Sequence, residues 1–280
     1  MKYKALRIKT KYWRPGENYH KIILENISHE IKQADIVVLS EKALSVAKGR
    51  IIDENHVHPS SLSKFLVIVW MRIIWGYILG HLCHLKLKNI ERFKTYPLKE
   101  GTPHKQLAFR YFGFLQALRH GSEGGMDVSN LPFAYACLPL DDPLDDAKQI
   151  YDSIRQSLGK KCGVMIVDTD MCYSWRNLHF TPRQNSIKGI IHKGGFLTYV
   201  ICRALRFKAR ATPLAFVNLN LNIDEILRIA NLANKKRGSG AGRTAWDMIE
   251  KFNVDYTGVT WDMLDEVDHY PVVLIRKADV

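Results

Sequence analysis

A short apolar run that ends at an acidic residue limits the folds that this chain can adopt. Val-Met-Ile-Val at 164–167 is followed directly by Asp168, and such a run is typical of a strand buried within a sheet. Residues 141–158 before it have apolar side chains at helical spacing and end at Gly159. Residues 133–138 are predicted to form a further strand. This order of strand, helix and strand predicts a mixed α and β protein of the α/β class.

The other predicted elements also mix strands with helices. The main interruption lies between Lys86 and Lys105, where charges, two prolines and a glycine predict a loop or an excursion. We expect a single domain over residues 1–280, with two lobes divided near 105–125. The remaining elements are strands at 34–40 and 271–275, a turn or short helix at 41–48, and helices at 105–119 and 223–236.

Residues 65–85 are apolar and long enough to span a bilayer, and a serine before them can cap the helix. Arg72, His81 and His84 interrupt the segment, and a central arginine costs at least ~2.5 kcal/mol in lipid. We therefore predict a helix that is buried or faces a second subunit, and no membrane partner.

The chain has a formal charge of +13, from 41 Lys and Arg against 28 Asp and Glu, which favours polyanionic partners. Basic residues are denser at 203–210 and 235–243 but form no extended tail, so this pattern does not favour nucleic acid as a partner. The five cysteines show no paired spacing, and the first residues contain no apolar leader. These features indicate a reduced, cytoplasmic protein.

Two acidic turns are candidates for a metal or phosphate site. Asp168 and Thr169 follow the predicted strand, and a glycine-rich turn leads into Asp127, Ser129 and Asn130. Ligands of α/β proteins bind at the carboxyl ends of strands, and small oxygen-bearing groups suit Mg²⁺ or Mn²⁺. Taken separately, the same side chains also fit helix caps or Asx turns.

The segment Gly238-Ser239-Gly240-Ala241-Gly242-Arg243 is the best candidate for a phosphate cradle. Its glycines let backbone N–H groups approach an anion, and a helix start is predicted near Thr244. The segment does not match the P-loop spacing, and a helix rather than a strand precedes it. A flexible linker between two helices stays open as the alternative.

Four stretches of the sequence resemble the coenzyme F420-0:L-glutamate ligases, which join glutamate to a deazaflavin precursor in a GTP-dependent γ-peptide bond. Gly125-Met-Asp-Val-Ser-Asn130 is close to the family's Gly-Ile-Asp-x-Ser-Asn motif. The other stretches that carry the resemblance are 35–50, Leu138-Pro-Leu-Asp-Asp-Pro143, and Val167-Asp-Thr-Asp170 with Trp175-Arg176. Residues 224–230 and 271–276 also look like the family's closing helix and last strand.

The resemblance implies a mixed-sheet fold and an intertwined homodimer. It implies that Asp127, Asp168 and Thr169 hold one or two Mg²⁺ or Mn²⁺ ions, with the two aspartates as the catalytic pair. It also implies that Asn130 and the Glu41-Lys42 pair contact GTP, with residues 238–243 in place of the family's late nucleotide loop. An acid substrate would be activated as an acyl phosphate, which an amine substrate then attacks.

The sequence departs from the family pattern near the expected acceptor end of the site. Val46 and Lys48 replace a lysine and a glutamate of the family, and residues 170–174 replace its Phe-Gly-Arg-Pro. A metal- and nucleotide-dependent amide ligase is the leading hypothesis. A catalytically silent nucleotide-binding paralogue and an RNA-binding protein that uses residues 203–243 are the alternatives.

Overall fold

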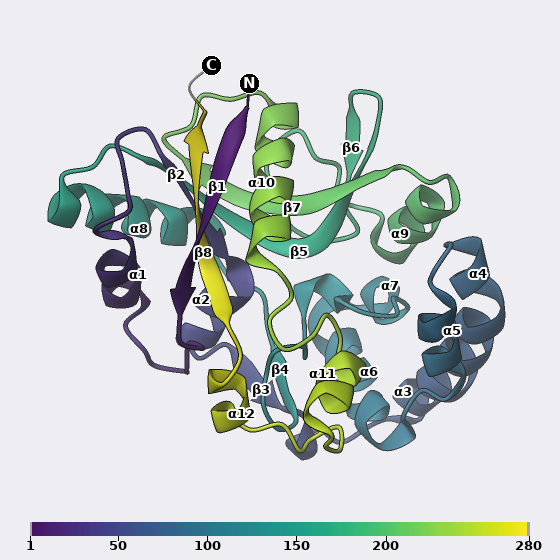
Figure 1. Ribbon diagram of the computed structural model, residues 1–280. Helices are drawn as coiled ribbons and strands as arrows, with labels where there is room; N and C mark the ends of the chain where they lie inside the picture. Colours follow the sequence, from purple (N-terminus) through teal and green to yellow (C-terminus); the bar gives the residue numbers. More distant parts are fainter. Residues whose placement is uncertain (1, 279–280) are drawn as a thin grey trace.

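The computed structural model describes residues 2–278, and a mixed sheet forms its centre (Figure 1). The strands run in the order β1-β8-β2-β5-β6, and β7 also pairs with β5. Only β2 and β5 pair in parallel; the other pairings in this sheet are antiparallel. The strands are β1 (Tyr3–Thr10), β2 (Ile36–Ser40), β5 (Gly163–Trp175), β6 (Leu178–Phe180), β7 (Lys208–Val217) and β8 (His269–Lys277).

Helices cover both faces of this sheet. On one face, α1 (Tyr19–Ile27) and α8 (Pro143–Leu158) pack with the sheet in a buried core. On the other face, α10 (Ile223–Arg237) packs through its own apolar stripe (Figure 1). The predicted α/β class is confirmed, because burial of β2 and β5 on both faces requires their continuous apolar runs.

The predicted strand at 163–167 is real but continues further. β5 runs on to Trp175, and its pairing with β7 shifts register around Val167 and again between Asp168 and Met171. Such bulges bend a strand and redirect its side chains. The two predicted strands that flank α8 do not share a sheet, because β4 (Tyr135–Cys137) pairs with β3 (Ile51–Asp53) instead.

The long apolar segment forms a nearly continuous helix made of α3 (Ser61–Phe65), the π-helix η2 (Leu66–Leu79) and α4 (Gly80–Leu82). Ser60 caps it, accepting a bond from the Ser63 amide. One side is buried around Met71 and Trp75. By length and composition this helix, Ser61–Leu82, would suffice to cross a bilayer, and 33% of its most apolar stretch is buried.

The predicted loop at 86–105 is wrong. This segment forms α5 (Leu87–Lys94) and the first half of α6 (Leu98–Phe112), which therefore starts before the predicted residue 105. Pro103 lies inside α6, where a proline normally weakens a helix. Tertiary packing outweighs that cost, because Gly101 lies against the Tyr96 ring and Leu107 and Ala108 are fully buried.

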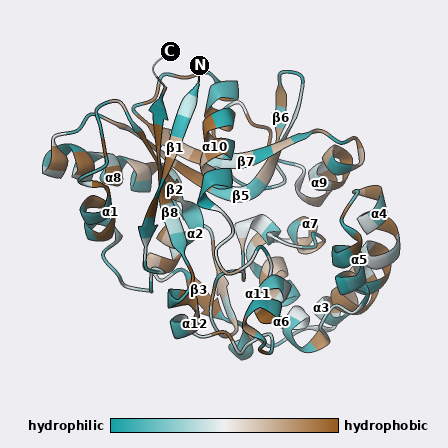
Figure 2. Cartoon of the chain, viewed as in Figure 1, coloured by the Kyte–Doolittle hydropathy of each residue, from teal (hydrophilic) through white to brown (hydrophobic). Residues whose placement is uncertain are grey.

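The remaining elements connect these parts. The central strands of the sheet consist mostly of hydrophobic residues, drawn in brown in Figure 2. Thr244 caps α11 with a capping box, which confirms the helix start predicted there. These elements are α2 (Glu41–Ala47), η1 (Glu54–His56), α7 (Phe114–Ala117), η3 (Glu123–Gly125), α9 (Gly195–Ala204), α11 (Ala245–Phe252) and α12 (Trp261–Asp265).

Candidate functional site

A cavity of about 900 Å³ brings most of the predicted site residues together. Both acidic turns and the glycine-rich segment border it, although they lie far apart in the sequence. The predicted residues that line the cavity are Lys42, Asp127, Asn130, Asp168, Thr169, Gly238, Ser239, Gly240 and Arg243. Glu41 is the exception, because its side chain is buried behind this wall.

The parallel pairing of β2 with β5 explains why two of these segments meet. Ser40 pairs with Val167, so α2, which starts right after β2, begins beside Asp168. Parallel strands place their carboxyl ends at one edge of a sheet. Glu41 and Asp168 are therefore neighbours although 127 residue positions (168 − 41) separate them.

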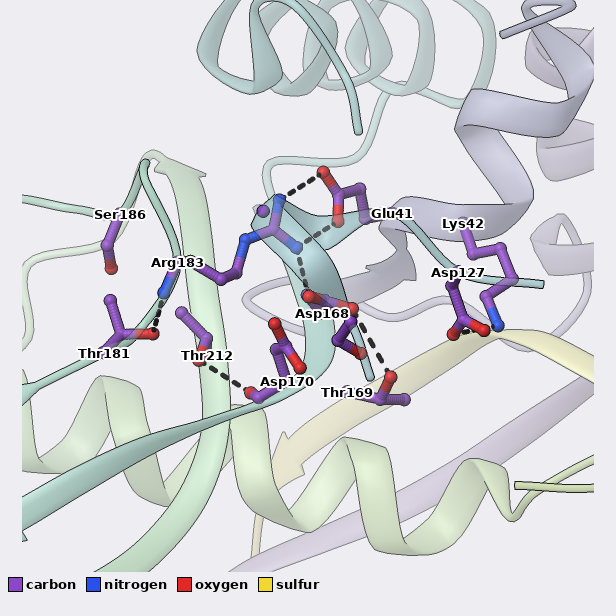
Figure 3. Close-up of polar contacts among 12 residues, drawn as sticks. Glu41, Lys42, Asp127, Asp168, Thr169, Asp170, Thr181, Arg183, Ser186 and Thr212 are labelled. Atoms are coloured by element: carbon purple, nitrogen blue, oxygen red, sulfur yellow. Dashed lines mark hydrogen bonds and ion pairs between the residues drawn. The ribbon is translucent and has the colours of Figure 1, made fainter. Parts of the chain in front are cut away.

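Arg183 lies between these two carboxylates (Figure 3). Its Nη1 and Nη2 atoms lie 2.8 and 3.0 Å from the Glu41 carboxylate oxygens, and Nη1 also pairs with Asp168. Burial raises the pKa of Glu41, against the lowering effect of Arg183. Burial acts in the same direction on Asp168, but Arg183 and Lys42 outweigh it and hold the pKa of Asp168 below its usual value.

Lys42 forms a second ion pair across the cavity wall. Its Nζ atom lies 2.5 Å from Asp127 Oδ2 (Figure 3). The same atom donates to the Ser129 hydroxyl and carbonyl, at 2.8 and 3.0 Å. An antiparallel bridge between Asp127 and Cys137 fixes the backbone of this turn. Asp127 also accepts from the Ser129 amide at 2.7 Å, so the predicted Asx turn is present within the site.

Asn130 joins the acidic turn to the glycine-rich segment. Its Oδ1 accepts from the Ala241 amide at 2.6 Å and from Tyr12 Oη at 3.0 Å, and its Nδ2 donates to the Gly242 carbonyl at 2.8 Å. A Cβ atom at Gly240 would lie 2.5 Å from Asn130 Oδ1, and φ there is +58°. A glycine is needed at this position, which favours a docked loop over a free linker.

Further cations surround Asp168 and Asp170. Arg119 Nη1 lies 3.3 Å from Asp170 Oδ2, and burial raises the pKa of Asp170 to about 6 against the effect of Arg119. Arg237, at the end of α10, also lines the cavity. Burial lowers the pKa of Arg237 to about 10, and the charge of Asp168 opposes this. This arrangement can neutralise a polyphosphate.

A buried charge network supports the glycine-rich turn that precedes Asp127. Glu123 accepts from Lys105 at 2.5 Å and lies 3.2 Å from His104 Nε2, while His104 Nδ1 lies 2.7 Å from Glu54. Glu123 and Lys105 are fully buried. Burial opposes protonation of His104, but the two glutamates raise its pKa to about 10.

The oxygen donors fit a hard divalent cation by their chemistry. The carboxylates of Asp127, Asp168 and Asp170 and the hydroxyl of Thr169 all border the cavity. Their arrangement is different from a formed metal site: over residues 2–278, no group of three or more His, Cys, Asp or Glu side chains is placed to hold a metal ion. Lys42 and Arg183 neutralise two of these carboxylates.

Several residues of this site have no signal in the sequence that would identify them. Arg183 and Arg119 belong to no motif, and their partners Glu41, Asp168 and Asp170 lie far away in the chain. Val46, where the resembling family has a lysine, is buried with Leu131 and Cys137. This position therefore contributes an apolar contact and no charge to the wall of the cavity.

Comparison with known proteins identifies what this chain is similar to. The family model described as F420-0:Gamma-glutamyl ligase matches residues 7–183. An uncharacterized protein of Methanocaldococcus jannaschii is 34% identical over 285 residues, covering 98% of this chain and 96% of that protein. The coenzyme F420:L-glutamate ligase of Methanopyrus kandleri is 23% identical over 159 residues, covering 56% of this chain and 55% of that enzyme.

Proposed function

Because this chain belongs to the F420-0:gamma-glutamyl ligase family, we propose that it is a nucleotide- and metal-dependent amide ligase. The observation that carries the proposal is the meeting of both acidic turns and the glycine-rich segment in one cavity. Such a site needs donors for a cation, cations for a polyphosphate and backbone N–H groups for an anion. Carboxylates, basic side chains and the glycine-rich segment all border this cavity.

The residues divide into two groups in this proposal. Asp127, Asp168 and Thr169 would hold one or two Mg²⁺ or Mn²⁺ ions, which requires that the ion pairs of Asp127 with Lys42 and of Asp168 with Arg183 open. The nucleotide lies along Lys42, Asn130 and the segment 238–243, with GTP proposed from the family. The basic side chains replace the hydration of the phosphates with fixed positive charge.

The proposed reaction has two steps. A carboxylate oxygen of the acid substrate attacks the γ-phosphorus of the nucleotide, and the nucleoside diphosphate leaves, giving an acyl phosphate. The amine substrate then attacks the acyl carbon, loses a proton and expels inorganic phosphate. Lys42 and Arg237 stabilise the charge that builds on the phosphoryl oxygens, and bound Mg²⁺ or Mn²⁺ supplies further charge neutralisation.

The second candidate function is a catalytically silent nucleotide-binding protein. The ion pairs of Lys42 with Asp127 and of Arg183 with Asp168 favour it, since they occupy the carboxylates that a cation needs.

The position of Arg210 counts against the RNA-binding alternative, because this side chain is buried and paired with Asp224 at 3.0 Å. From the family we also propose that the protein is a cytoplasmic homodimer.

Thermal unfolding distinguishes a formed nucleotide site from an unrelated cavity. We expect GTP with Mn²⁺ to raise the Tm, while either alone has little effect, because the ion joins the carboxylates to the phosphates. At a ligand concentration 100 times Kd the stabilisation is about 2.7 kcal/mol. ATP with Mn²⁺ serves as the parallel sample. An unchanged Tm in every combination would contradict both the ligase and the silent nucleotide-binding protein.

A further inference from the structure

Two long segments of this chain contain no acidic residue. Residues 55–90 have no Asp or Glu, and residues 171–223 have none either. Lysine and arginine occur throughout both segments. Any surface built from them is therefore apolar, neutral or positive.

The fold brings these two segments together at α9 and α4. Arg203 of α9 donates from Nε to the Cys83 carbonyl at 3.1 Å and from Nη2 to the His84 carbonyl at 3.2 Å. His84 Nε2 lies 3.3 Å from the Ala204 carbonyl. The end of α9 is thus held against the turn that follows α4 (Figure 1).

The outer side of α9 is an apolar stripe. Leu197, Ile201 and Leu205 are 54, 54 and 63% exposed, and their spacing of four residues puts them on one side of the helix. Leu115 on α7 lies beside Gly195 at the start of α9, and Leu82 immediately precedes the Cys83 contact. We call this surface the α9 face; it consists of Leu82, Leu115, Leu197, Ile201 and Leu205, all exposed.

The exposed charged residues that flank α4 and α9 in the sequence are basic. These residues are Lys86, which follows α4, and Lys193 and Arg206, which precede and follow α9. Within residues 2–278 none of them forms an ion pair with a carboxylate, and Arg206 contacts only the His84 ring. Exposed aliphatic side chains bordered by Lys and Arg are typical of surfaces that enter the headgroup region of anionic membranes. The surrounding charge thus complements a negatively charged lipid surface.

We propose that the α9 face docks this protein on the surface of a membrane that contains anionic lipids. The aliphatic side chains enter the boundary between headgroups and acyl chains, and the basic residues lie against lipid phosphates. A second copy of the chain fits less well, because it would bring positive charges against positive charges. Nucleic acid fits less well because exposed leucine and isoleucine gain nothing from phosphates. The inference replaces our expectation of no membrane partner, and the chain need not span the bilayer.

Docking would also set the position of the candidate site. Tyr199 lies on the same helix but on its inner side, where it lines the cavity and its hydroxyl is 2.7 Å from His120 Nε2. One helix therefore separates the lipid-facing side chains from the cavity. The inference stands apart from the proposed ligase activity, since it needs neither nucleotide nor metal.

Vesicle co-sedimentation tests this inference with the full chain. We expect binding to vesicles of phosphatidylglycerol and phosphatidylcholine in equal parts, but not to vesicles of phosphatidylcholine alone. Ile201→Asp should reduce the bound fraction by about tenfold or more, because a carboxylate is both repelled and poorly solvated there. Raising the salt concentration should also weaken binding through screening. Leu144→Asp is the matched control: Leu144 is 45% exposed on α8.

Both variants should keep the wild-type Tm, which shows that they fold. Absence of binding to anionic vesicles, or equal binding to phosphatidylcholine alone, would overturn the inference. So would an equal loss in Leu144→Asp. A wild-type dimer that Ile201→Asp converts to a monomer would assign the face to a second copy, and RNA retention lost in Ile201→Asp would assign it to nucleic acid; either result overturns membrane docking.

Discussion

Replacing Asp168 by asparagine is expected to lower nucleotide-dependent turnover by about 10²–10³-fold, the usual cost of losing one well-placed electrostatic group. The change removes the negative charge on which cation binding depends in our proposal. It keeps the size of the side chain and its position at the bulge of β5. The measurement is release of nucleoside diphosphate that depends on an added acid and an added amine.

The remaining ion pairs of the site should keep the Asp168→Asn variant folded. Arg183 keeps both of its contacts with Glu41 when Asp168 is neutral, so the buried guanidinium is not left without a partner. We therefore expect the Asp168→Asn protein to fold but to lose the rise in Tm with GTP and Mn²⁺. Asp145→Asn, an exposed change on α8, is the control and should behave like wild type. Full turnover in Asp168→Asn would contradict the assigned role.

Replacing Glu123 by glutamine is expected to have the largest effect on stability. Glu123 is fully buried between Lys105 and His104, and its neutralisation leaves two buried cations with less compensation. Breaking a buried ion pair from one side costs about 3–5 kcal/mol. Urea denaturation gives the free energy of unfolding. The control is Glu250→Gln, which removes the charge of an exposed partner of Lys88 and Arg92 and should leave the free energy of unfolding close to that of wild type.

The loss in Glu123→Gln should depend on pH, because His104 titrates. Its folded-state pKa of about 10 lies above the unfolded value of about 6.5, so its contribution is complete below that unfolded value and disappears as pH rises through about 10. Without Glu123 the pKa of His104 is raised less. The difference between wild type and variant should therefore be larger at neutral pH than at alkaline pH. An equal difference at both would contradict the charged state of His104.

The sheet and its covering helices could be predicted from local sequence because their signals are local. Apolar runs at 34–40 and 271–275 and helical spacing at 141–158 and 223–236 each correspond to a strand or helix at nearly those bounds. Residues 86–105 could not be predicted in this way. Their prolines and glycine are breakers in isolation, and only contact with the rest of the fold, such as Gly101 against Tyr96, offsets them.

In the candidate site, too, some features could be predicted from local sequence and others depend on tertiary contacts. The acidic turns were visible in the sequence, and the parallel pairing of strands explains why Asp168 lies beside the start of α2. The cations that now hold these acids were not visible, because Arg183 and Arg119 find their partners only through the tertiary fold. The contact of residues 238–243 with Asn130 could not be predicted from the spacing of residues in the sequence either.

The position of Mn²⁺ in crystals grown with a non-hydrolysable GTP analogue tests whether Asp127 and Asp168 bind the cation beside the nucleotide. Our account predicts an anomalous difference peak in contact with the carboxylates of Asp127 and Asp168, beside the analogue's phosphates. It also predicts that Lys42 leaves Asp127 to contact a phosphate oxygen. A structure with analogue and Mn²⁺ at saturating concentration, no such peak, and both ion pairs unchanged would contradict it.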